Sequence, residues 1–150
     1  MKKVIIVRHG DYDGNHRLSP TGENQMKKLA QLIEPHLLPN TIFLSSTAPR
    51  ADDSSRVLAT ALKLKYKSFP ELHSGNDSPV GQDNQRAINL INDEAKKNQA
   101  DCVIVLTHLE YASVLPYKFR ADNYRSINKG QGLIIDFEHN STAFVSGLSF

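Results

Sequence analysis

Two arginines and two histidines of this chain stand at or near the ends of short apolar runs. Arg8 and His9 directly follow the run VIIV, and His108 follows the run CVIVLT. Arg50 comes a few residues after the run TIFLS, where a helix is predicted to begin. Guanidinium groups bind phosphate oxygens as a planar fork, and a helix N-terminus adds backbone donors. A neutral imidazole can attack phosphorus. These residue types therefore predict an anion site that transfers a phosphoryl group to a histidine.

The apolar runs alternate with segments of helical spacing, which together would position these side chains. The spacing predicts helices from Ser19-Pro20 to about Pro35, over 50–64, from about residue 85, and over 109–119 with an interruption at Pro116. Strands are predicted at 4–7, 41–45, 66–69, 101–108, 132–137 and 142–147, the last two joined by a tight turn. Residues 70–84 mix Pro, Gly, Asn, Asp and Ser, which is typical of a loop.

This alternation predicts a three-layer α/β/α sandwich with a mostly parallel central sheet. Buried parallel strands appear in a sequence as continuous apolar runs, because helices cover both faces of the sheet. Ligands of such sheets bind beyond the carboxyl ends of the strands. Arg8 and His9 are therefore expected at the same edge of the sheet as Thr107 and His108.

The composition predicts an ordinary cytoplasmic domain. The chain has 150 residues, so we expect a single domain over 1–150. Its 18 basic and 16 acidic residues are too balanced to indicate a nucleic-acid partner. The first apolar run is too short for a signal peptide, and no run is long enough to cross a membrane. Cys102 is the one cysteine, which excludes a disulfide within the chain. The sequence predicts no oligomeric state, although strands at 132–147 would offer an edge for pairing.

Five blocks of the sequence resemble motifs of the histidine phosphatase superfamily, which has the phosphoglycerate mutase-like fold. VRHG resembles the first of them, and LSPTGENQ is similar to the LSxxGxxQ segment. SSTAPRADDSS resembles the block SSxxxRAxxT, PELHSG resembles the segment with the acidic proton donor, and VLTHLEY resembles the block with the second histidine. The blocks occur in the order of the family and span nearly the whole chain, which makes the resemblance far more specific than RHG alone.

The resemblance implies a role for each of these residues. His9 would be the nucleophile and become phosphohistidine. Arg8, Arg50 and His108 would hold the phosphate. From the residues alone, Asn15 or His16 is a further candidate to line that pocket. Glu71 would protonate the leaving group and then help to activate water, with no metal or other cofactor. From the residues alone, Asp11, Asp13 and Glu110 remain alternatives to Glu71 as the acid.

Two departures from larger relatives narrow the resemblance to the small phosphohistidine phosphatases of the SixA type. Leu109 follows the second histidine where those relatives usually have Gly. Only the short loop 75–84 stands where metabolite-processing relatives have a helical insertion that closes over the substrate. An open pocket suits a phosphorylated protein side chain, so the substrate is expected to be a phosphomonoester or a protein phosphohistidine, either a small molecule or a phosphoprotein. The alternatives are a mutase, a sugar-phosphate phosphatase, or a phosphate-binding module without turnover.

The stretch HGDYDGNH also permits a metal site, which we consider the weaker hypothesis. His9, Asp11, Asp13 and His16 are all potential ligands. The spacing of Asp11, Asp13 and Asn15 mimics a calcium loop, but that loop requires Gly at its sixth position and Glu at its twelfth. His16 and Gly22 occupy those positions here. The sequence therefore predicts no metal ion.

Overall fold

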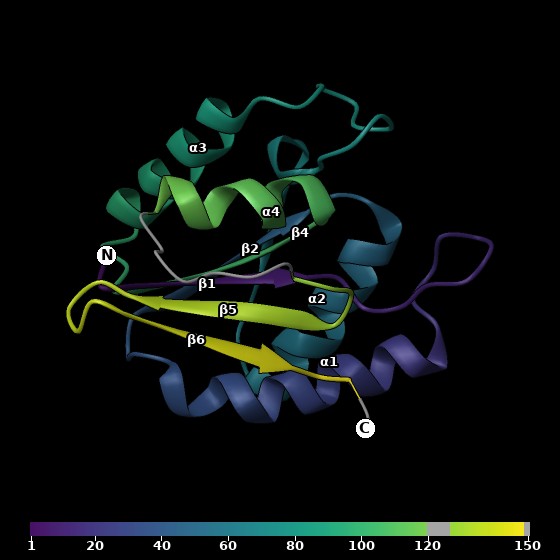
Figure 1. Ribbon diagram of the computed structural model, residues 1–150, viewed down its shortest axis with the longest axis horizontal. Coiled ribbons are helices and arrows are strands. Elements are labelled where there is room, and N and C mark those ends of the chain that lie inside the picture. The colour runs from purple at the N-terminus through teal and green to yellow at the C-terminus, as the bar shows by residue number, and fades with distance from the viewer. Residues whose placement is uncertain (120–126, 149–150) are drawn as a thin grey trace.

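The computed structural model describes residues 1–119 and 127–148 and contains one six-stranded sheet (Figure 1). The strands lie in the order β3-β2-β4-β1-β5-β6. They are β1 (Lys3–Arg8), β2 (Thr41–Ser46), β3 (Lys67–Phe69), β4 (Cys102–Thr107), β5 (Gln131–Asp136) and β6 (Ser141–Ser146). The α-helices are α1 (Pro20–Ile33), α2 (Pro49–Leu62), α3 (Asn84–Lys97) and α4 (Leu109–Lys118), with short 3₁₀ turns at Glu34–His36 and Pro70–Leu72.

The pairing of the strands confirms the predicted mostly parallel sheet. β1, β2, β3 and β4 run parallel, whereas β5 pairs antiparallel with both β1 and β6. β5 and β6 form the hairpin expected from the two apolar runs near the end of the chain. The two central strands are buried along nearly their whole length, which is why their sequences are uninterrupted apolar runs.

Helices cover both faces of the sheet, so the molecule has the three predicted layers. In Figure 1, α3 and α4 lie on one side of the sheet and α1 and α2 on the other. Successive side chains of a strand point to opposite faces. Val4 and Ile6 accordingly pack into the core under α3 and α4, and Ile5 and Val7 pack into the core against α1 and α2. β1 is therefore fixed from both sides, and its last residue is held rigidly at the edge of the sheet.

The observed helices follow the predicted ones with one difference. Ser19 caps α1 by accepting a hydrogen bond from the Gly22 N–H, as the Ser-Pro pair predicts, and the chain passes into a 3₁₀ turn at Pro35. Pro116 was expected to interrupt the helix 109–119, but it lies inside the last turn of α4 without ending it. Within the described ranges, no helix combines the length and apolar character needed to span a membrane.

Candidate active site

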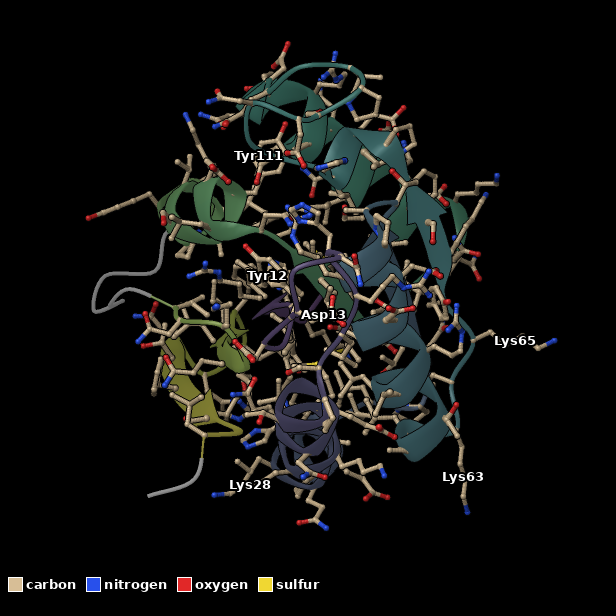
Figure 2. The ribbon with its side chains drawn as sticks, turned by 90° about the vertical axis from the view of Figure 1, so that its right-hand side faces the viewer. Tyr12, Asp13, Lys28, Lys63, Lys65 and Tyr111 are labelled. Atoms are coloured by element: carbon tan, nitrogen blue, oxygen red, sulfur yellow. The ribbon has the colours of Figure 1, made fainter. Side chains whose placement is uncertain are left out.

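The register of the parallel strands places the two histidines side by side. Arg8 at the end of β1 pairs with Thr107 at the end of β4, so His9 and His108 both follow directly after the sheet. The His9 N–H extends this ladder by donating to the Thr107 carbonyl oxygen, at 3.2 Å. The two imidazole rings lie 5.0 Å apart, centre to centre, with 59° between their planes. Figure 2 views the molecule from this end of the strands, with Tyr12 near its middle.

A pocket of about 340 Å³ opens at this end of the sheet. Its wall brings together four of the predicted site residues, Arg8, His9, Arg50 and His108, which come from three separate segments of the chain. Sequence reasoning did not single out most of the other lining residues. They are Tyr12, Ser74, Gly75, Asn76, Asp77, Leu109 and Glu110, of which Glu110 was considered as an alternative acid and Leu109 as a departure from the larger relatives.

His9 is held in a form that can act as a nucleophile. Its Nδ1–H is placed to donate to the carbonyl oxygen of Gly10, at 2.9 Å, which leaves Nε2 with its lone pair. Burial lowers the pKa of His9 to about 4, and the nearby cations Arg50 and Arg8 act in the same direction. The imidazole is therefore neutral at physiological pH.

This neutral state gives a direct prediction about titration. The His9 ring resonance in an NMR titration is expected to shift with a midpoint near pH 4 instead of the ordinary 6.5. Between these two values the unfolded chain binds a proton that the folded chain does not, so this group makes the fold less stable as the pH falls through that window. The His9 resonance is identified as the one that is missing from the spectrum of His9→Ala. A midpoint above 6 would contradict the buried, neutral imidazole.

His108 presents one ring nitrogen that lacks a partner. Its Nε2 lies 2.7 Å from the hydroxyl oxygen of Ser46, which also accepts the Ala48 N–H. Its Nδ1 is buried and has no hydrogen-bond partner within the described residues. Burial and the neighbouring His9 lower the pKa of His108 to about 2, so this ring too is neutral. A buried polar atom without a partner is costly, which indicates that a ligand completes this position.

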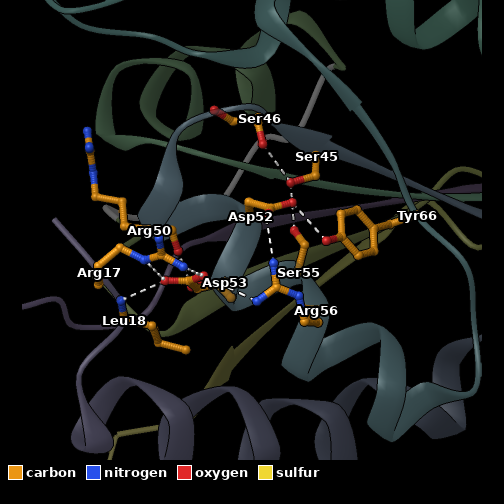
Figure 3. A network of polar contacts seen from close by, with 11 residues as sticks. Arg17, Leu18, Ser45, Ser46, Arg50, Asp52, Asp53, Ser55, Arg56 and Tyr66 are labelled. Atoms are coloured by element: carbon orange, nitrogen blue, oxygen red, sulfur yellow. Dashed lines mark hydrogen bonds and ion pairs between the residues drawn. The ribbon is translucent and has the colours of Figure 1, made fainter.

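Arg50 lines the pocket and does not pair with the nearest carboxylate of its own helix. That carboxylate, Asp53, accepts two hydrogen bonds from Arg17, at 2.7 and 2.8 Å (Figure 3). Among the described residues, the ion pair of Arg50 is a long contact, 3.7 Å, with the carboxylate of Asp77 at the rim. Its Nε, like that of Arg8, is buried without a partner in the part of the chain described here. Both guanidinium groups are therefore incompletely bonded next to the pocket.

The loop between β1 and α1 is fixed by the same network. Besides Arg17, the Leu18 N–H donates to the Asp53 carboxylate at 3.2 Å, which fastens the loop to α2. Within the loop, the Tyr12 ring stacks on His16 at 5.9 Å and meets the edge of His9 at 5.4 Å. The guanidinium carbon of Arg50 lies 5.2 Å from the centre of the Tyr12 ring, within range of a cation–π contact. Tyr12 thus forms one wall of the pocket.

The segment LSPTGENQ supports His9 through close packing of backbone on backbone. A Cβ on Gly10 would lie 2.8 Å from the Gly22 carbonyl oxygen, and one on Gly22 would lie 2.1 Å from the Asp11 carbonyl oxygen. Gln25 then accepts the Asp11 N–H through Oε1 at 2.9 Å. The turn after His9 is therefore pressed against the first turn of α1, which only glycine permits.

This packing predicts that Gly22→Ala destabilises the fold. The new methyl group would overlap with the backbone of Asp11, which cannot move without displacing His9, and such overpacking costs about 1–3 kcal/mol. Gly14→Ala is the matched control, because a Cβ there meets no atom within 4 Å. Urea unfolding of both variants measures the difference. Equal free energies of unfolding would show that the turn is not packed as described.

Two of the predicted site residues lie outside the pocket wall. Glu71 sits in the 3₁₀ turn Pro70–Leu72, and its Oε2 is buried without a hydrogen-bond partner among the described residues. Asn15 is exposed in the loop before α1, where its N–H donates to the Asp13 carboxylate. Neither residue is among those that line the pocket.

The residues of the metal hypothesis have other partners. The Asp11 carboxylate accepts from the Ser19 hydroxyl and from Lys129, and both hydrogen bonds lower the pKa of Asp11. Asp13 accepts the N–H groups of Asn15 and Arg17. Over the described ranges, no three His, Cys, Asp or Glu side chains gather as a metal site. These carboxylates shape the loop.

Comparisons with known proteins concern the family and the fold. Residues 4–76 match the family model of the histidine phosphatase superfamily (branch 1). The fold is similar to that of the protein histidine phosphatase SixA complexed with tungstate, with a TM-score of 0.68 and 17% identity over 95% of this chain and 94% of that one. A mycobacterial glucosyl-3-phosphoglycerate phosphatase has a TM-score of 0.68 and 15% identity, over 97% of this chain and 98% of that one. A putative alpha-ribazole-5'-P phosphatase from Escherichia coli has a TM-score of 0.67 and 17% identity, over 97% of this chain and 95% of that one. Comparison with curated protein sequences gave no match.

Proposed function

We propose that this chain, which matches the family model of the histidine phosphatase superfamily over residues 4–76, is a metal-independent phosphatase that forms a phosphohistidine on His9. One observation carries the proposal. The neutral His9 ring, with Nδ1 bonded and Nε2 not, lines a pocket together with the two arginines and the buried, unpartnered Nδ1 of His108. Simple binding of an anion would not require a nucleophile held in this tautomer.

In the first proposed step, the lone pair of His9 Nε2 attacks phosphorus and forms a P–N bond. The bond from phosphorus to the leaving group breaks, and its electrons go to the leaving oxygen or nitrogen, which takes a proton from solvent water. Arg8 and Arg50 bind the equatorial oxygens and stabilise their charge. In His108, a hydroxyl proton donated by Ser46 to Nε2 would place the ring proton on Nδ1, where it can donate to a phosphoryl oxygen.

In the second step, a water oxygen attacks phosphorus, the P–N bond breaks and the electrons return to His9. The product is inorganic phosphate, and the proton lost by the water needs an acceptor. Glu110 is the best-placed acceptor, since its carboxylate lines the pocket and is oriented by the Ser74 hydroxyl at 3.0 Å. No metal ion takes part in either step.

The shape of the pocket favours a phosphorylated side chain over an enclosed metabolite. The connection from the Pro70–Leu72 turn to α3 is short, and it leaves the Asp77 side chain 61% exposed at the rim. Leu109, also on the rim, is 44% exposed. Such a pocket admits a phosphohistidine of a protein, the kind of substrate named for the SixA neighbour. That the protein works in the cytoplasm stays a prediction.

The position of Glu71 leads to a prediction about leaving groups. An imidazole or phenol leaves with little help, whereas a sugar alkoxide needs a well-placed acid. Because Glu71 does not line the pocket, Glu71→Gln is expected to change kcat/KM by less than about threefold on an aryl phosphate and on a phosphohistidine peptide. Steady-state kinetics on both substrates measures this. A loss of roughly a hundredfold on either substrate would show that Glu71 is the proton donor.

The proposed activity is tested by turnover. The purified protein, treated with a chelator, is incubated with an aryl phosphate and separately with a phosphohistidine peptide, and released inorganic phosphate is measured. We expect multiple turnovers on both. No release from any phosphate ester or phosphoramidate would contradict the proposal and leave a binding module.

A further inference from the structure

The pocket contains charges of both signs. Arg8 and Arg50 supply two positive charges and the carboxylates of Asp77 and Glu110 supply two negative ones. Neither carboxylate was expected at the site from the family motifs, and neither is needed to bind phosphate. Carboxylates at a phosphate pocket are unfavourable for affinity, because they repel the ligand. The second step proposed above gives Glu110 a role but leaves Asp77 without one, so the pair of carboxylates calls for an explanation in terms of another part of the substrate.

The two carboxylates flank a common space. A Cβ on Gly75 would lie 3.3 Å from Glu110 Oε1 and 3.4 Å from Asp77 Oδ1. Gly75 has a φ of +101°, where side chains are strained, so this space is kept free of a side chain by the backbone as well. The gap between the carboxylates is thus a built feature of the pocket wall.

The two carboxylates are only weakly neutralised by the protein. Asp77 lies 3.7 Å from Arg50 and 3.2 Å from His73, and Glu110 accepts one hydrogen bond from the neutral Ser74 hydroxyl. A bound phosphoryl dianion would take over the bonding of Arg50, so the pocket and its ligand would together carry an excess of negative charge. A positive group next to the phosphoryl group would restore the balance.

From this arrangement we infer that the substrate carries a positive charge beside its phosphoryl group, which lies between Asp77 and Glu110. The chemical class is a phosphorylated amine or a phosphorylated side chain with a basic neighbour. This inference rests on the proposed function, since it names the substrate of the same site. It assigns Asp77 and Glu110 as specificity determinants. Glu110 accepts the proton of the attacking water in the second step, after the cationic leaving group has left the pocket.

The test is a binding measurement that does not require turnover. Calorimetry compares three phosphonates of similar size, which differ in the group at the far end of the chain. That group is an ammonium in 2-aminoethylphosphonate, an uncharged methyl in propylphosphonate and a carboxylate in 3-phosphonopropionate. At a pH where each phosphonate group is a dianion, we expect the cationic ligand to bind roughly tenfold more tightly than the neutral one, and the anionic ligand to bind more weakly still.

Variants assign this preference to the two carboxylates. The double variant Asp77→Asn, Glu110→Gln is expected to bind all three phosphonates with affinities equal to within about twofold. The variants are compared by the ratio of their affinities for the three phosphonates, because the loss of the Asp77 charge beside Arg50 raises the affinity for every phosphonate alike. Glu138→Gln, which removes one negative charge at the exposed β5–β6 turn, is the control and is expected to keep the preference.

Equal binding of the three ligands by the native protein would overturn the inference, and so would a preference that survives in the double variant or disappears in Glu138→Gln. The outcome is separate from that of the proposed function. Selective binding without hydrolysis of any phosphate refutes the phosphatase activity but supports the charge preference. Hydrolysis with unselective binding supports the phosphatase activity but refutes the charge preference.

Discussion

Replacement of His9 by alanine is expected to lower kcat/KM on an aryl phosphate by a factor on the order of 10⁴ or more, since the covalent route is lost with the nucleophile. His9 is 2% exposed and its ring contacts Tyr12 and His108, so the smaller side chain leaves a space without introducing a clash. Phosphate release is measured at saturating and at low substrate concentration.

The control for this variant is a histidine elsewhere on the chain. The His139 side chain is 76% exposed beside Asp136, at the turn between β5 and β6, and His139→Ala is expected to leave kcat/KM within about twofold. Circular dichroism shows whether His9→Ala is folded. A folded His9→Ala protein with near-native turnover would remove the covalent mechanism, because no other group in the pocket was assigned to attack phosphorus.

Replacement of Arg50 by alanine is expected to reduce kcat/KM by roughly 10²–10³, the range seen when one donor to a developing oxyanion is removed. The Arg50 side chain is only 12% exposed and lines the pocket, so its charge acts at close range with little screening. Arg50→Lys is expected to recover little of this loss, because an ammonium cannot reproduce the planar fork.

The same helix offers a matched control. Arg56 also lies on α2, but it points away from the pocket and pairs with Asp52 at 2.8 Å, with a side chain that is 58% exposed. Arg56→Ala removes the same charge from the same element and is expected to change kcat/KM by less than about threefold. Equal losses in the two variants would mean that Arg50 acts through the overall field of the protein and does not contact the phosphoryl group.

The sheet and the central part of the site could be predicted because they depend on local sequence features. A parallel strand that is buried on both faces must be a continuous apolar run, so the appearance of Arg8 and His9 marks the end of β1. The same applies to His108 after β4, and the register of the two strands then brings the histidines together. Neither step requires knowledge of side-chain orientation.

The remainder of the pocket could not be predicted, because it depends on how loops fold over the sheet. Glu71 was expected in the pocket, yet the direction of its side chain is set by a single 3₁₀ turn. Asp77 and Tyr12 line the pocket through loops whose sequences show no periodicity. Pro116 within α4 shows the same limit, since proline near the end of a helix removes a hydrogen bond without ending the helix.

The covalent intermediate on His9 is the central claim, and trapping it is the most direct test. The protein is mixed with an aryl phosphate labelled on phosphorus, quenched in alkali, and digested for mass spectrometry. We predict label that is stable in alkali and labile in acid, located on the peptide that contains His9, and absent from His9→Ala. Rapid turnover with no label on the protein, or label on a residue other than His9, would contradict the mechanism.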